Sequence, residues 1–190
     1  PEKWRIALNG VLPDDLVVKH VQQVPSDFHA RHSSVGKRYR YLVCNLPYRS
    51  PFSRNKSWWV RKSLNLEAIR EASSYLMGKH DFSAFRAAAC SSPNPNKDLR
   101  EILCDVKPWL HANLCFELEA DSFLQHMVRI MVGTLVQVGT GKLKPEQMKG
   151  ILESRDRTQA GLTAPAHGLY ALAVRYPEDR IEWPDELMDS

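Results

Sequence analysis

The most informative stretch of this sequence is Ser122-Phe123-Leu124-Gln125-His126-Met127-Val128-Arg129-Ile130-Met131-Val132-Gly133, which continues in apolar residues to Val138. Apolar side chains recur at helical spacing on two faces, so the pattern predicts a long and largely buried helix over 122–138. Ser122 with Gln125 three residues later predicts a capping-box start, and Gly139 predicts the end. The remaining polar stripe consists of His126, Arg129 and Gly133.

Arg129 places a guanidinium group in the middle of this apolar helix. A buried charge costs several kcal/mol unless it is paired and hydrogen-bonded. Arg129 therefore requires a local carboxylate or backbone carbonyls, or else access to a polyanion, and the helix pattern leaves these alternatives open. Gly133, one turn further on, is typical of a close approach by another backbone or by a ligand.

The rest of the chain predicts the α+β class, with a mainly antiparallel sheet and helices packed on one face. Strands are predicted over 16–24, 37–45, 101–106, 112–121 and 169–176, the third and fourth forming a hairpin around Pro108. Helices are predicted over 65–77, with Asn65 as cap and Gly78 as stop, and over 145–154. In the strand 37–45, one face carries Tyr39, Tyr41 and Val43, and the other carries Arg38, Arg40, Leu42 and Cys44.

Positive charge is concentrated in the first third of the chain. The net charge is +4, but residues 1–62 hold twelve Lys/Arg against four Asp/Glu, and residues 63–190 hold fourteen against eighteen. Around residues 28–41 the basic residues alternate with aromatic ones, a pattern that suits a phosphate backbone with bases to stack. An ordinary solvated strand face is the competing explanation.

Several functional classes find no support in the sequence. No apolar run approaches the ~20 residues of a membrane span, and no glycine-rich loop opens a helix, so neither membrane contact nor a nucleotide cofactor is predicted. His29, His32 and Cys44 lack a second close pair of ligands, so no metal is predicted. The four cysteines are widely spaced and indicate reduced core residues in an intracellular compartment, cytoplasm or organelle, that the sequence does not name.

Four blocks, in order and spacing, resemble the TruA-type tRNA pseudouridine synthases. They are Phe28-His29-Ala30-Arg31 with Lys37-Arg38-Tyr39-Arg40-Tyr41, Gly78-Lys79-His80-Asp81-Phe82 with Phe85, the stretch 122–133, and Ala164 with Gly168-Leu169-Tyr170. The resemblance extends from about Leu8 to Tyr176. It implies a two-lobed fold that acts as a homodimer on tRNA, in the anticodon arm, without cofactor or metal.

The resemblance also implies residue roles. The reaction breaks the C1′–N1 bond of uridine, turns the uracil and rejoins it through C5. Arg129 would pair with the nucleophilic aspartate, Tyr39 would stack on the flipped-out uracil, and Leu169 would pack against the target base. Contacts to RNA are expected from Arg31, Lys37, Arg38, Arg40 and His126, although alternation along a strand prevents these residues from all facing one way. For Tyr39, Leu169 and His126, ordinary strand or core roles stay open.

The nucleophilic aspartate of the family does not occur in these residues. The family places it in an Arg-Thr-Asp-x-Gly-Val-His segment before the Leu8–Pro13 region, and no Arg-Thr-Asp triplet is present; Asp156-Arg157-Thr158 has another order. Because the sequence begins at Pro1, it is expected to belong to a longer protein and to be inactive alone. Residues 1–45 would complete an N-terminal lobe, 46–176 would form the C-terminal lobe, and 177–190 would be an acidic tail.

Two other functions remain as hypotheses beside the enzyme. One is a non-catalytic RNA-binding protein that kept the fold and lost the nucleophile. The other is a protein whose basic stretch binds a protein partner or an anionic surface; for that protein, Tyr39→Ala would have little effect.

Overall fold

The computed structural model describes residues 1–107 and 113–177. They form two compact units, one of residues 35–175 and one whose described residues are 1–34 and 176–177. No helix in the part of the chain that the structure describes is both long and apolar enough to cross a membrane.

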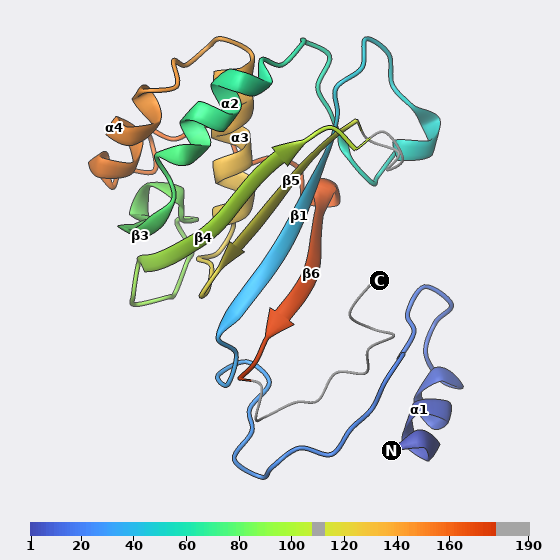
Figure 1. The fold of residues 1–190 in the computed structure, drawn as a ribbon. Helices are drawn as coiled ribbons and strands as arrows, with labels where there is room; N and C mark the ends of the chain where they lie inside the picture. Colours follow the sequence, from blue (N-terminus) through green and yellow to red (C-terminus); the bar gives the residue numbers. More distant parts are fainter. Residues whose placement is uncertain (108–112, 178–190) are drawn as a thin grey trace. The chain divides into compact units, whose positions relative to one another are not determined.

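The larger unit is built on a sheet that has six strands among the described residues (Figure 1). One edge of β1 (Gly36–Cys44) pairs with β5 (Leu114–Ala120), followed by β4 (Asn96–Asp105) and β3 (Gly78–Asp81), all antiparallel. The other edge pairs antiparallel with β6 (Leu169–Arg175) and, over two residues, parallel with β2 (Trp58–Trp59). The predicted mainly antiparallel α+β fold is confirmed.

Three helices of this unit lie together on one side of the sheet (Figure 1). They are α2 (Leu66–Ser74), α3 (Met127–Gly139) and α4 (Gln147–Ser154). Of the thirteen residues of α3, eleven are buried, so α3 is the centre of the core, as its apolar faces predict. The predicted cap of α2 is also confirmed, because the Asn65 side chain accepts the amide hydrogen of Ala68.

The two faces of β1 have different surroundings, as the alternation predicts. Tyr39, Tyr41 and Val43 belong to the core, which also contains Phe116 and Leu118 of β5. On the opposite face, Arg38 and Arg40 both bind the carboxylate of Glu117, at 2.7 Å each. Arg38 also lies 3.0 Å from a carboxylate oxygen of Glu101. This outer face is therefore held by ion pairs and not by helix packing.

The pKa of Glu117 reflects this environment. Burial alone raises the pKa of a carboxyl group, but the hydrogen bonds and charges of Arg40 and Arg38 outweigh burial and bring the pKa of Glu117 below its ordinary value. Its carboxylate form is therefore stabilised by folding.

The predicted start of the long helix is wrong by five residues. Helix α3 begins at Met127, and His126 before it has a left-handed backbone with φ of 61°. Ser122 does not form a capping box: its amide and hydroxyl bind the Asp121 carboxylate, while the Gln125 carbonyl accepts the amide of Ala87. The local bonds of Ser122 to Asp121 and the tertiary bond of Gln125 to Ala87 take the backbone groups that a capped first turn would need.

The predicted strand over 16–24 is also wrong. The smaller unit contains the helix α1 (Glu2–Asn9), which the sequence analysis did not predict, and no strand among its described residues. The Asn9 side chain binds both the amide and the carbonyl of Val18, so these groups are not available to a partner strand. Phe28 and Tyr176 pack their rings 5.1 Å apart in the same unit.

Other predictions have mixed outcomes. Strands β2 and β3 were not predicted, since each has fewer than five residues. Cys44, Cys104 and Cys115 are buried as expected and burial raises the pKa of the Cys115 thiol to about 11, whereas Cys90 is only half-buried. The turn around Pro108 lies outside the described residues, as does nearly all of the predicted acidic tail. The lobe boundary at residue 45 refers to a longer chain and stays a prediction.

Helix α3 and the segment before β6 approach each other through their backbones. A Cβ atom added at Gly133 would lie 1.9 Å from the carbonyl oxygen of Leu162, so no side chain fits there. The amide of Ala164 donates to the carbonyl of Arg129 at 3.1 Å, and the amide of Gly161 donates to the Thr134 hydroxyl at 2.9 Å. The close approach that Gly133 predicts is confirmed, and its partner is a backbone.

Gly133→Ala is therefore expected to destabilise the protein by about 1–3 kcal/mol or more, because the 162–164 segment must move away from α3. Gly150→Ala is the matched control: it lies in helix α4 with open space around the added Cβ, and is expected to gain about 0.5–1 kcal/mol. Urea unfolding of both variants measures the difference. Equal stabilities would contradict the contact.

Glu117→Gln is expected to lower the free energy of unfolding at pH 7 by about 1–3 kcal/mol, because three charged hydrogen bonds from Arg38 and Arg40 are weakened. Since the folded-state pKa of Glu117 is lowered, its contribution is present above the unfolded value of about 4.3 and is lost as pH falls through the folded pKa. The gap between wild type and variant should close in acid. Glu153→Gln, on an exposed i,i+4 pair, should leave stability nearly unchanged at every pH.

Candidate functional site

Arg129 lies in the first turn of α3 and is half-buried. Its Nε donates to the carbonyl oxygen of Ala164 at 2.6 Å, and its own carbonyl accepts the amide of Ala164. Arg129 and Ala164 therefore hold each other by one side-chain and one backbone hydrogen bond. Within residues 1–107 and 113–177, the structure shows no carboxylate in an ion pair with Arg129 and no acceptor for its Nη1 or Nη2.

The segment after Ala164 is held against β1. The Tyr41 hydroxyl donates to the carbonyl of Pro165 at 2.7 Å, and burial raises the pKa of Tyr41 while the charge of Arg129 acts in the opposite direction. A side chain at Gly168 would meet the Tyr41 ring and the Leu42 carbonyl within 3 Å. These contacts fix where Leu169 begins β6, opposite Tyr41 in the strand register.

Tyr39 lies two residues before Tyr41 on the same face of β1. Its ring makes an edge-to-face contact with Phe123, with the ring centroids 5.3 Å apart. Tyr39 and Leu169 are both half-buried and pack against the core. Thus three elements, β1, α3 and the start of β6, bring Tyr39, Arg129 and Leu169 to one face of the sheet.

The predicted RNA-contacting residues are not brought together as a group. By alternation Lys37 shares the face of Tyr39, whereas Arg38 and Arg40 lie on the other face and bind Glu117. A phosphate at Arg38 or Arg40 would compete with that carboxylate. Arg31 is exposed and belongs to the smaller unit.

His126 is exposed, so the core role that the sequence left open for it does not hold. Its left-handed backbone conformation is uncommon for residues other than glycine, although histidine adopts it more often than most, and such conformations cluster at functional sites. The conformation places His126 at the start of α3, one turn before Arg129.

Sequence reasoning missed the residues that position the site. Tyr41 was assigned to a strand face, but its hydroxyl bond to Pro165 joins segments 124 residues apart. Phe123 was assigned to a helical apolar face, but it lies before the helix and supports Tyr39. The one signal available was Gly168, a glycine just before a predicted strand, which is typical of a close backbone approach.

The arrangement has a definite chemical capacity. A guanidinium held at Nε presents its two Nη groups as a fork, the geometry that binds a carboxylate or a phosphate in bidentate fashion. On the same face of the sheet, the aromatic ring of Tyr39 and the aliphatic side chain of Leu169 provide apolar contact for a planar group. The site therefore fits an anion and a flat ring together.

Comparison with known proteins gives one consistent result. The profile of the family described as tRNA pseudouridine synthase matches residues 72–177. A protein of Thermoanaerobacter sp. (strain X514) named tRNA pseudouridine synthase A is 43% identical over 175 residues, which cover 92% of this chain and 70% of the relative. A protein of the same name from Thermus thermophilus is 43% identical over 182 residues, covering 95% and 71%. This chain therefore belongs to the TruA-type tRNA pseudouridine synthase family.

Proposed function

We propose that the protein of which these residues form a part isomerises uridine to pseudouridine in tRNA, and that Arg129, Tyr39 and Leu169 belong to its active site. The observation that carries this assignment is the state of Arg129. A half-buried guanidinium with only its Nε bound to the described chain retains two donors for a partner carboxylate, and a buried charge without such a partner is costly.

In this proposal the partner of Arg129 is the nucleophilic aspartate. Since no Arg-Thr-Asp triplet occurs in the sequence, the aspartate comes from outside these 190 residues, and the 190 residues alone are inactive. Arg129 then orients the carboxylate and keeps it ionised, because an adjacent positive charge lowers a carboxyl pKa. No metal or organic cofactor takes part.

Tyr39 and Leu169 receive the base in this proposal. Flipping a base out of a helix costs a few kcal/mol of stacking, which an aromatic face and an apolar contact in the enzyme offset. Tyr39 is suited to this because Phe123 supports one edge of its ring. Lys37 on the same face, with Arg31 and His126, contacts phosphates; the target uridine lies in the anticodon arm, and the enzyme acts as a homodimer.

A non-catalytic RNA-binding protein is the second candidate, favoured by the same absent triplet. It predicts tRNA binding without product for the complete protein. The two candidates are distinguished by one assay of pseudouridine formation on an unmodified tRNA transcript, with the modified positions mapped.

The complete protein is expected to form pseudouridine in the anticodon arm, and residues 1–190 alone to form none. In the complete protein, Arg129→Lys is expected to reduce kcat by at least about 100-fold, the scale of losing an electrostatic contact to the reacting centre, with tRNA affinity largely kept.

Arg157→Lys is the matched control, because Arg157 binds the same segment through the Ala160 carbonyl and the Thr163 hydroxyl. It should retain most of the activity. Full activity of Arg129→Lys would contradict the assigned role of Arg129. Product from residues 1–190 alone would show that the nucleophile lies within them.

A further inference from the structure

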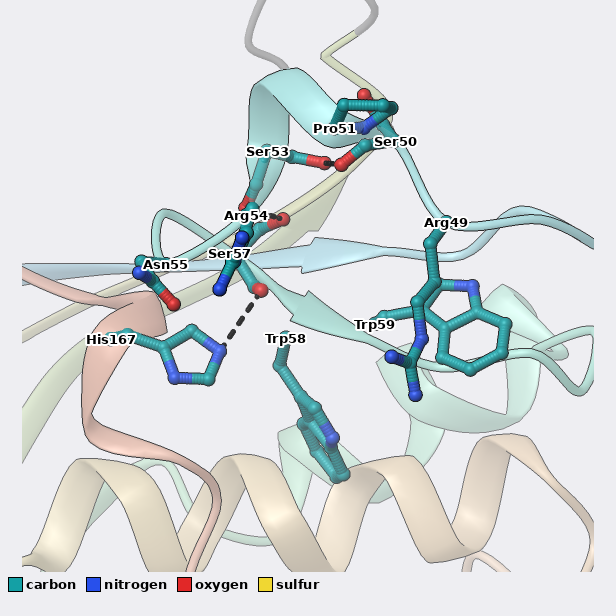
Figure 2. A pocket seen from close by; sticks show the side chains of 10 residues that line it. All are labelled: Arg49, Ser50, Pro51, Ser53, Arg54, Asn55, Ser57, Trp58, Trp59 and His167. Atoms are coloured by element: carbon teal, nitrogen blue, oxygen red, sulfur yellow. Dashed lines mark hydrogen bonds between the residues drawn. The ribbon is translucent and has the colours of Figure 1, made fainter.

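A hollow in the larger unit lies beside the segment that contains Gly168 and Leu169. It has a volume of about 620 Å³ and is lined by residues of the 49–59 segment and by His167 (Figure 2). This volume is within the ~300–1,000 Å³ range of small-molecule sites. We refer to it as the 49–59 hollow.

The 49–59 hollow is electropositive. Its lining includes Arg49, Arg54 and His167 and no carboxylate. Both arginines are exposed, and the structure shows neither in an ion pair with a carboxylate of the described residues. Between Asp27 and Glu67 the chain carries nine Lys/Arg and no Asp/Glu, so nothing nearby in sequence offsets the charge. An anion is the natural ligand.

Flat surfaces accompany the charge. The Arg49 guanidinium lies over the Trp59 indole, 4.6 Å from the ring centroid, and Figure 2 shows the two groups side by side, away from His167. The indole is fixed by its Nε1 bond to the Leu46 carbonyl at 3.0 Å. Nucleic-acid bases stack on aromatic rings and on arginine planes. The hollow thus offers both of the groups that a nucleotide requires.

The hollow is joined to the active-site segment by direct bonds. His167 Nε2 lies 3.1 Å from the Ser57 carbonyl (Figure 2), and the Tyr170 hydroxyl donates to the Lys56 carbonyl at 2.7 Å. These residues flank Gly168 and Leu169. Trp58, a further lining residue, makes an edge contact with Tyr41, at 6.5 Å between ring centroids. A ligand in the hollow would therefore lie next to the residues that place Leu169.

We propose that the 49–59 hollow binds one nucleotide of the RNA strand near the target uridine, with its phosphate at Arg49 and Arg54 and its base on the Arg49–Trp59 stack. This rests on the proposed function for the identity of the RNA. A polymer is favoured over a free nucleotide because the anion donors are exposed, long side chains. None of the α-helices among the described residues begins at the lining of the hollow, and the start of a longer helix is the usual cradle of a free nucleotide's phosphates.

The test uses the complete protein and an unmodified tRNA transcript, with affinity measured across a range of salt concentrations. Arg49→Ala/Arg54→Ala is expected to weaken tRNA binding at least about tenfold and to reduce the salt slope by about 1.5–2, as two phosphate contacts are lost. Lys144→Ala/Lys149→Ala on the α4 side removes the same charge from exposed positions. It should change the affinity less than about threefold.

Two further variants separate stacking from charge. Arg49→Lys keeps the charge and loses the planar fork. Its salt slope should therefore equal that of the wild type, while its affinity for tRNA should be lower. Trp59→Leu removes the indole and should weaken binding without changing the slope. Melting temperatures identify any variant that unfolds. If the double variant or Trp59→Leu unfolds, the test rests on comparing Arg49→Lys, which changes an exposed position, with the wild type.

The outcomes separate this proposal from the proposed function. Unchanged tRNA affinity and slope in the double variant overturn the RNA subsite, whether or not pseudouridine forms. Loss of affinity in a protein that forms no pseudouridine keeps the subsite and removes the catalytic function. Equilibrium dialysis with uridine monophosphate and with inorganic phosphate provides the last arm: arginine-dependent binding of either, with tRNA affinity unchanged, would make the hollow a free-nucleotide or phosphate site instead.

Discussion

The larger unit depends on the contact of two backbones, where the Leu162 carbonyl occupies the space that a side chain at Gly133 would need. This contact lets the 162–164 segment run directly over α3, and only at that distance can Ala164 exchange hydrogen bonds with both the backbone and the side chain of Arg129. The position of the guanidinium is therefore set by main-chain packing. Main-chain packing is stiffer than a network of flexible side chains, so it holds the Nε of Arg129 in a fixed place.

The same contact determines which group of the protein binds the Arg129 side chain. Its Nε is satisfied by a carbonyl, which carries no formal charge, so the full positive charge is left for a partner at the Nη groups. Had a local carboxylate bound Arg129, that carboxylate would have neutralised its charge. The Tyr41 hydroxyl donates to the carbonyl of Pro165. It therefore does not compete with Arg129 for the carbonyl of Ala164. The Ala164 carbonyl thus positions Arg129 through Nε without cancelling the positive charge of its guanidinium.

Much of the fold follows from local pattern, and most of the site does not. The faces of β1, the pairing of β4 with β5 and the Asn65 cap were predictable because each depends on alternation or on a side chain within three residues. The start of α3 was not, because Asp121 and Ala87 take the groups of its expected first turn. Arg129 and Gly133 could be singled out as a buried charge and a close approach, but the partner segment, 29 or more residues further on, could not. The predicted strand over 16–24 does not form, because the Asn9 side chain binds the amide and the carbonyl of Val18 that a partner strand would need.

A count of charges along the sequence has the same limit, because it does not show which basic residues form ion pairs in the fold. The basic residues near the start of the chain look alike in sequence, yet Arg38 and Arg40 are placed by alternation against Glu117, whereas Arg49 and Arg54 lie on a segment with no carboxylate in its hollow. Paired arginines stabilise the sheet and contribute little attraction at a distance, because their fields are cancelled locally. Among the described residues, Lys37, Arg49 and Arg54 are shown in no ion pair, so their positive charge is not cancelled locally. The ion pairs on the outer face follow from the alternation of β1, whereas the free charge of Arg49 and Arg54 lies on a segment after that strand.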